Sequence, residues 1–501
     1  MNDTRPFWEQ GRVWLLLALF SALPFVVAPM PMMPDHFAHV ARYHVMLNHA
    51  DSALLQRYFD VQWALIGNLG VDLLMMVLGR VLPVETAATV SVALIPMFTV
   101  AGIYALARAV HGRVPATALF ALMMVWTFTF VWGFENYHLS VALALLCAAA
   151  WIRLDGAATW LRWGLMAPFS LVVWLAHVSG WGAMGLFVLG WEMATRAHGV
   201  PWRGLPGAML RIFVRMLPLA LPALVMLVWR QKAEGPTKLL LSGLGTKLRY
   251  GLEMLQAEML WLDHLLLAVL LAASAFMLVR LWHNRNQPMV MATGWQLAIY
   301  LIMPYALFGS YFADQRLLPV VGMAFFLALP ESDMRMGRRL AMVALALFGV
   351  RIGEISLGWW QRGQVMQAEL VALEQIPHGS RVASVARLSN CDGGVLHGFD
   401  HLANFVITRR DGFANTQWDV AGAQLVRPVY NRAYGYNDNN SSQLGSKAHR
   451  TCYGLPLDEI VDNLPRERFD FVWTFDAPVA RPWLAPVFVG QHGRLYRIVA
   501  P

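Results

Sequence analysis

A short stretch near the N-terminus carries the residue types best suited to chemistry. Residues 34–43 read PDHFAHVARY, and on a helix Asp35, His39 and Arg42 would share one face because they follow one another at i, i+4 and i+7. A carboxylate beside histidines and an arginine could act as a general base. A solvated helix start is the plainer interpretation, since the helix dipole favours an acidic residue near a helix N-terminus.

Other polar residues fall at the ends of apolar runs and could line the same cavity as Asp35. They are Glu135, Asn136, Tyr137 and His177. Polar helix ends are common, so each of these residues is a weak candidate by itself. Asn68 and Asp72 are candidates of the same kind, with solvation at a membrane interface as the simpler account.

Two arginines stand where a phosphate group could bind. Arg316 follows Asp314 in a short loop, and its planar guanidinium suits a phosphate. A surface ion pair or a lipid headgroup anchor is the alternative for Asp314 and Arg316. Arg351 lies in an apolar run with Glu354 at i, i+3. Charged residues at such depth usually pair with one another, and a contribution to a phosphate pocket is the second interpretation.

A metal ion could join Asp35. His36 and His39 lie at i, i+3 beside it. Zinc sites take three or four ligands, and no third helical ligand is evident. A divalent ion, Mg²⁺ or Mn²⁺, held by Asp35 together with phosphate oxygens fits these residues better.

The cysteines bear on the redox environment. Cys391 and Cys452 both lie in the polar C-terminal part, and they could form a disulfide if that part lies outside the cytoplasm. Two unrelated buried thiols are the alternative. Cys147 lies in an apolar run and is expected to be an ordinary buried residue.

The composition is that of a membrane protein. Hydrophobic residues make up 57% of the 501 residues and charged residues 14%, where soluble chains carry about 25% charged residues. The net charge of +8 could suggest a nucleic-acid partner. The arginines gather instead in short loops between apolar runs, as the positive-inside rule predicts, and no basic stripe is interleaved with aromatics. We therefore expect membrane lipids and no nucleic acid as partners.

Eleven apolar runs are long enough, or nearly so, to cross a bilayer. They lie near 13–31, 87–108, 115–133, 137–153, 161–178, 180–196, 213–230, 264–282, 289–309, 316–330 and 337–357. The first is expected to be a retained helix, because it is too long for a signal peptide. With the N-terminus in the cytoplasm, the arginine-rich loops fall inside and the C-terminal part falls outside.

The chain divides into two parts. Residues 1–360 form a helical membrane domain, whose first outer loop, 32–86, is expected to hold amphipathic helices at the interface. Val61–Pro83 is assigned to that interface and not to a further span, because it carries polar residues at helical spacing. Residues 361–501 are expected to form a small α/β domain, with strands at 381–386, 469–475 and 487–499. The fold class is thus a polytopic α-helical membrane protein with a small extracytoplasmic α/β domain.

This layout resembles that of the GT-C superfamily, integral membrane glycosyltransferases that use polyprenyl-phosphate-linked sugars. The resemblance covers the whole chain as architecture. As a motif it rests on Pro34-Asp35, with Arg42 a few residues on. His36 departs from the family pattern, in which a second acidic residue often follows the Asp.

The resemblance implies that Asp35 is the catalytic carboxylate, that the donor is a polyprenyl-phosphate sugar, and that the acceptor is a glycan, lipid or protein. An inverting hexosyl or pentosyl transfer at the periplasmic face of a bacterial inner membrane is the expected activity. By the same reading the substrate-binding residues are His36, His39, Arg42, Glu135, Asn136, Tyr137, His177, Asp314, Arg316 and Arg351. A non-enzymatic flippase for lipid-linked glycans and a surface-polysaccharide polymerase or ligase are the alternatives.

No Walker loop, Gly-x-Ser-x-Gly elbow or Cys-x-x-Cys motif occurs in the sequence. Their absence argues against an ATP-driven pump, a serine hydrolase and a thiol oxidoreductase.

Overall fold

The structure, a computed structural model, describes residues 5–228, 241–306, 312–387, 399–419, 422–430, 443–444 and 456–499. The predicted disulfide partners Cys391 and Cys452 lie outside the described residues. Cys147 is buried within a helix, as expected.

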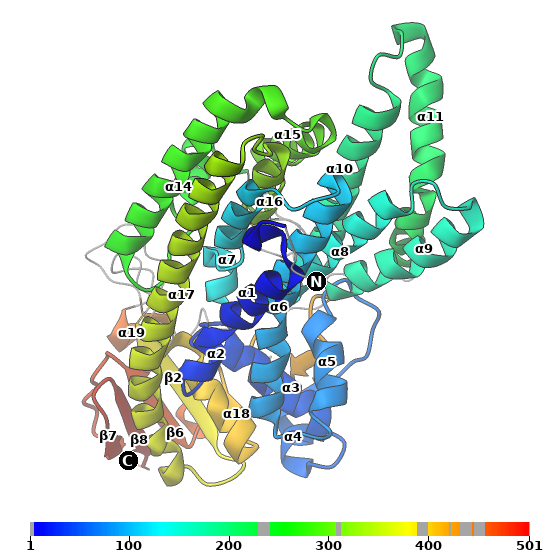
Figure 1. The fold of residues 1–501 in the computed structure, drawn as a ribbon. Coiled ribbons are helices and arrows are strands. Elements are labelled where there is room, and N and C mark those ends of the chain that lie inside the picture. Colours follow the sequence, from blue (N-terminus) through cyan, green and yellow to red (C-terminus); the bar gives the residue numbers. More distant parts are fainter. Residues whose placement is uncertain are drawn as a thin grey trace.

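Helices occur in each of the eleven apolar runs. Their bounds are α1 Gly11–Ser21, α2 Leu23–Val27, α6 Val84–His111, η2 Ala116–Met124, α7 Phe128–Trp132, α8 Glu135–Arg153, α9 Thr159–Ala176, α10 Val178–Arg196, α11 Leu205–Met216, η4 Leu217–Ala220, α12 Leu221–Val228, α14 Leu260–Leu281, α15 Gln287–Ile302, α16 Leu317–Ala328 and α17 Met334–Leu370. Figure 1 shows them as a bundle of long helices, in which α17 runs beside α14.

Five of the described helical segments are long and apolar enough to cross a membrane by themselves. They are Val84–His111, Glu135–Arg153, Trp202–Val228, Leu260–Asn284 and Met334–Gln375. Several predicted spans are broken, because proline or glycine interrupts the run. The first run, for example, divides at Ala22 before Pro24 into α1 and α2. The membrane location follows from these helices, and the count of eleven crossings stays a prediction.

The run near 115–133 is enclosed by protein. Its first part, η2, is a 3₁₀ helix with every side chain buried, and it packs against α16 and α17. Its second part, α7, ends at Gly133, whose φ of 117° stops the helix. This enclosed segment leads directly into α8.

The first outer loop contains α3 His36–Asn48, α4 Ala53–Tyr58, β1 Phe59–Val61 and α5 Gly70–Leu78. The expectation that Val61–Pro83 forms one interfacial helix is wrong, since only α5 is helical there. Solvation of Asp72 by the interface is wrong as well. Its side chain is 2% exposed and pairs with Arg42 of α3, because a buried carboxylate requires a partner.

The C-terminal part is built on a mixed sheet. The strand order is β3-β2-β6-β8-β7, with β5 also paired to β2. The strands are β2 Arg381–Arg387, β3 Phe413–Ala414, β5 Gln443–Leu444, β6 Phe471–Phe475, β7 Leu484–Val489 and β8 Gly493–Ile498. β2 is parallel to β3, β5 and β6, whereas β8 is antiparallel to both of its neighbours, β6 and β7. The prediction of a single strand at 487–499 is therefore wrong. This range contains the end of β7, a turn that begins at Gly490, and β8, so it forms part of a hairpin.

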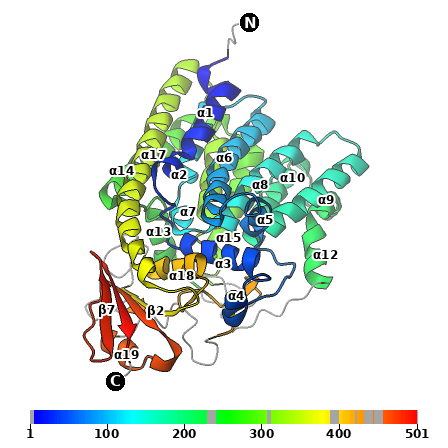
Figure 2. The same cartoon turned by 90° about the horizontal axis from the view of Figure 1, so that it is seen from below.

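Within its described residues, the helices of this part are η6 Val371–Gln375, η8 Phe399–Asn404, α18 Phe405–Arg410, α19 Leu457–Asp462 and η11 Arg466–Arg468. α17 is continuous from Met334 to Leu370, so it passes through the predicted boundary at 360–361 and links the two parts. Figure 2 shows the strands at one end of the bundle, with α18 lying beside α3.

Several contacts tie the C-terminal part to the first outer loop. β1 pairs antiparallel with β4, Val426–Pro428. The Tyr58 hydroxyl donates to the Gly379 carbonyl at 2.5 Å. His44 Nε2 lies 2.7 Å from Asp411 Oδ1. These contacts place η8 and α18 over the start of α3, where Asp35 lies.

Candidate active site

Asp35 lies at the junction of two chain segments, where it precedes the first residue of α3. Its backbone N–H donates to the Trp132 carbonyl at 3.1 Å, and its own carbonyl accepts from the His39 N–H at 3.1 Å. Gly133, at the end of α7, packs directly against Asp35. The carboxylate is thus held at the point where the first outer loop meets the α7–α8 junction.

Glu135 joins α3 to α8. His36 Nδ1 lies 2.6 Å from Glu135 Oε1, and the Tyr43 hydroxyl donates to Glu135 Oε2 at 3.0 Å. The three side chains are buried. Because both carboxylate oxygens of Glu135 already have partners, its role in this arrangement is to hold α3 in place.

Arg42 is engaged in a second buried cluster. Its Nη2 donates to Asp72 Oδ2 at 3.1 Å, and its Nε lies 3.0 Å from Asp72 Oδ1. Asn136 donates to Asp72 at 2.9 Å and accepts from the Val71 N–H at 2.6 Å. Two residues predicted to bind substrate therefore fix α5 against α3 and α8.

The carboxyl group of Asp35 has an unusual environment. Burial raises its pKa well above 3.8, and the negative charge of Glu135 raises it further. Asp400 acts in the same direction, whereas the Arg316 guanidinium lowers it. A side chain that is 15% exposed and holds a proton more tightly than an ordinary Asp is suited to proton transfer.

His39 forms one wall beside Asp35. Its Nε2 lies 3.2 Å from the Gly133 carbonyl, so Nε2 carries the hydrogen. Burial, followed by the positive charge of Arg42, lowers its pKa well below 6.5. The Trp418 ring from the C-terminal domain packs against the His39 ring, with 5.3 Å between the ring centroids. A neutral imidazole and an aromatic face thus border the carboxylate.

Arg316, Tyr137 and His177 form a group of their own. The Tyr137 hydroxyl donates to the Arg316 carbonyl. The Arg316 guanidinium lies over the Phe134 ring at 4.7 Å. The His177 ring packs edge-on to Tyr137 at 5.9 Å, and its Nδ1 accepts from the Ser179 N–H at 3.0 Å. The electrostatic effect of Arg316 on Asp35 connects this group to the carboxylate.

Asp314 and Arg351 have other partners. Asp314 Oδ2 accepts from Lys247 Nζ at 2.8 Å and from Ser242 Oγ at 2.5 Å. Arg351 bonds Asp263 at 2.5 Å and Glu354 at 2.9 Å and is fully buried. Both residues are in ion pairs. For Arg351 this agrees with the first interpretation from the sequence, in which it pairs with Glu354. Neither is brought to Asp35 by these contacts.

The sequence predicts a divalent metal ion at Asp35, which would need further donor groups nearby. Within the described ranges, no group of three or more His, Cys, Asp or Glu side chains could hold a metal ion. The carboxylate of Glu135 is already bonded to His36 and Tyr43. The described residues do not form a metal cage by themselves, and a divalent ion held by Asp35 together with phosphate oxygens stays a prediction, so we derive no catalytic step through a metal.

Two site residues were not predicted from the sequence. His401 Nε2 lies 4.0 Å from Asp35 Oδ1, and the His401 ring packs against Trp418 at 4.7 Å. Both residues belong to the C-terminal domain. No spacing or motif links positions near 400 to Asp35, so only the folded arrangement reveals them.

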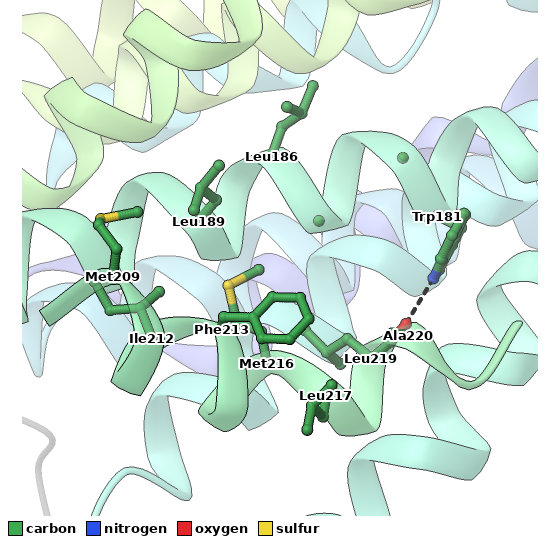
Figure 3. A pocket seen from close by; sticks show the side chains of 12 residues that line it. Trp181, Leu186, Leu189, Met209, Ile212, Phe213, Met216, Leu217, Leu219 and Ala220 are labelled. Carbon is green, nitrogen blue, oxygen red and sulfur yellow. Dashed lines mark hydrogen bonds between the residues drawn. The ribbon is translucent and has the colours of Figure 1, made fainter. Parts of the chain in front are cut away.

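A separate apolar cavity of about 430 Å³ lies between α10 and the α11–η4 segment. Figure 3 shows Leu186 and Leu189 from α10 opposite Phe213 and Met216 from α11, while Trp181 donates to the Leu219 carbonyl at 2.9 Å. Such a lining suits a hydrocarbon chain.

No protein-family model matches this chain. No curated protein matches it either. Among solved structures, ArnT from Cupriavidus metallidurans in the apo state is 13% identical with a TM-score of 0.53, over 98% of this chain and 99% of that one. The structure of ArnT from Cupriavidus metallidurans bound to undecaprenyl phosphate is 13% identical with a TM-score of 0.50, over the same shares. The chain therefore shares the fold of ArnT over 98% of its length, and the fold class expected from the sequence, a polytopic α-helical membrane protein with a small C-terminal α/β domain, is confirmed.

Proposed function

We propose that this protein is a membrane glycosyltransferase that moves a sugar from a polyprenyl-phosphate carrier to an acceptor at the extracytoplasmic face. The observation that carries the proposal is the setting of Asp35. This carboxyl group opens the first outer loop of a GT-C-like fold, is largely buried, and has a pKa well above its ordinary value. The neighbour with undecaprenyl phosphate bound supports a lipid phosphate as the carrier.

Asp35 would act as the general base. In its ionised form it accepts the proton of an acceptor hydroxyl or amine while the acceptor atom attacks the sugar C1. The bond between C1 and the phosphate oxygen breaks, and the polyprenyl phosphate leaves with the electron pair. A single displacement of this kind inverts the configuration at C1.

Arg316 would stabilise the departing phosphate. Its guanidinium lies over the Phe134 ring and acts electrostatically on Asp35, so a phosphate held there would lie near the base. Arg42 is unsuited to this task, because its guanidinium is already paired with the buried carboxylate of Asp72.

The test is transfer of labelled sugar from polyprenyl-phosphate sugars to membrane acceptors by the purified protein in lipid nanodiscs. We expect labelled product that carries one sugar residue. A longer glycan on the acceptor would indicate a polymerase or ligase. Movement of the labelled lipid across a vesicle bilayer without any transfer would indicate a flippase and contradict the proposal.

The orientation belongs to the same proposal, with the N-terminus in the cytoplasm and the C-terminal domain in the periplasm of a bacterial inner membrane. Alkaline phosphatase and green fluorescent protein fused to the C-terminus test it. We expect active phosphatase and no fluorescence, and the reverse would contradict this orientation.

A further inference from the structure

His401 reaches the start of α3 from the opposite end of the chain. Its side chain is 5% exposed, and its Nε2 lies 4.0 Å from Asp35 Oδ1. η8, which carries His401, packs against α3. A buried titratable group therefore faces the proposed base across the interface between the C-terminal domain and the membrane domain.

The hydrogen bonds of His401 fix its tautomer. Nδ1 lies 3.1 Å from the Thr416 carbonyl oxygen. A carbonyl oxygen only accepts, so Nδ1 carries the hydrogen and Nε2 of the neutral ring presents its lone pair to Asp35. Burial lowers the pKa of His401 to about 4, which keeps the ring neutral at physiological pH.

The ring is also held in place by its neighbours. Trp418 packs against His401 at 4.7 Å and against His39 at 5.3 Å, so one indole separates the two imidazoles. Asn404 donates to the His401 carbonyl at 3.1 Å. Since η8 and Trp418 both belong to the C-terminal domain, docking of that domain sets the distance between His401 and Asp35.

Other charged groups face Asp35 from each element around it. Glu135 comes from α8, Arg316 from the start of α16 and Asp400 from η8. Glu135 is held by His36 and Tyr43. His401 differs from these charged groups because its neutral ring presents the Nε2 lone pair, a hydrogen-bond acceptor for the protonated Asp35.

We propose that His401 is a positioning residue for Asp35, supplied by the C-terminal domain, which controls where the proton of the base resides. The proposal rests on the proposed function in naming Asp35 as the base. The lone pair of the neutral Nε2 accepts a hydrogen bond from the protonated Asp35 and so favours its protonated form. After the acceptor O–H or N–H bond breaks and the proton moves to Asp35, the proton leaves Asp35 to water, which regenerates the carboxylate. The separation of 4.0 Å requires a bridging water or a closure of about 1 Å when the acceptor binds.

The test uses the full-length protein in nanodiscs and measures the carboxylic-acid C=O infrared band of Asp35 across pH. Asp35→Asn identifies the band by its loss. His401→Gln should lower the midpoint of that band by about one pH unit, because a glutamine amide can donate to the carboxylate where the neutral imidazole presents a lone pair. His401→Asn is a second variant should His401→Gln fail to fold. His492→Gln, in the same domain, is the matched control and should leave the midpoint unchanged.

An unchanged midpoint in both folded His401 variants would overturn the proposal. Where sugar transfer is measurable, the acid limb of kcat/KM should move in His401→Gln by the same amount and in the same direction as the band. A fall in kcat/KM at every pH without that movement would indicate a merely structural role and overturn the proposal. The infrared result stands even if the wild-type protein transfers no sugar, so the proposed function and the role of His401 can fail separately.

Discussion

Gly133 leaves the space that Asp35 occupies. A methyl group added to Gly133 would lie 2.7 Å from the Asp35 Cβ, and its φ of 117° is one that other residues rarely adopt. The glycine that ends α7 therefore determines how closely the proposed base approaches the α7–α8 junction. The carbonyl oxygen of the neighbouring Trp132 accepts a hydrogen bond from the Asp35 N–H. The backbone of Trp132 and Gly133 therefore holds the proposed base in place.

Replacement of Gly133 by Ala should displace Asp35 and reduce kcat by about 100-fold, because a small misplacement of a catalytic group is costly. The measurement is steady-state sugar transfer at saturating donor. Gly164→Ala is the matched control, since nothing lies within 4 Å of the added methyl group there. Wild-type kcat in a folded Gly133→Ala variant would mean that the position of Asp35 is not critical.

The rate of transfer should depend on the protonation of Asp35. The base acts as its anion, and its pKa is raised, so kcat/KM should rise with pH through a midpoint well above 3.8. A pH profile of kcat/KM measures this limb. A limb at the ordinary Asp value would show that the carboxylate is solvated in the working enzyme.

Glu135→Gln should shift that limb to lower pH, because removing a nearby negative charge lowers the pKa of Asp35. The control is Tyr43→Phe, which removes the hydrogen bond to Glu135 Oε2 but no charge. Both variants should lower the unfolding temperature, and only Glu135→Gln should move the limb. Equal shifts in the two variants would contradict an electrostatic cause.

Asp314→Ala should destabilise the fold by about 3–5 kcal/mol, because it leaves the buried Lys247 ammonium without its carboxylate. Transfer per folded molecule should stay close to wild type. Unfolding temperature and specific activity together measure the two effects. The double variant Asp314→Leu with Lys247→Met should recover stability. Loss of donor affinity in a stable Asp314→Ala protein would instead favour the substrate-binding role predicted from the sequence.

Sequence patterns predicted the elements better than their partners. Apolar runs long enough for the bilayer fixed the order of the helices, and polar spacing marked 34–43 as the region of interest. Periodicity does not specify which buried charges pair. Arg42 is predicted to bind substrate but pairs with Asp72, and Val61–Pro83 is predicted to be one helix but is only partly helical.

The contribution of the C-terminal domain could not be predicted. His401 and Trp418 come near Asp35 only because β1 pairs with β4 and η8 packs on α3. Such contacts depend on docking of two parts that are far apart in sequence, and no local pattern encodes that docking. In contrast, Glu135 and Tyr137 lie directly after the enclosed segment, where polar residues at a helix start gave a local signal.

The most direct test compares Asp35→Asn with Asp51→Asn, an exposed aspartate in the same outer loop. Both proteins should fold and bind polyprenyl phosphate as the wild type does, and both are assayed for transfer of labelled sugar from polyprenyl-phosphate sugars. We predict that Asp35→Asn lowers kcat by about 100- to 10,000-fold, as expected for loss of a general base, while Asp51→Asn retains wild-type activity. Transfer by Asp35→Asn at the wild-type rate would contradict the central claim.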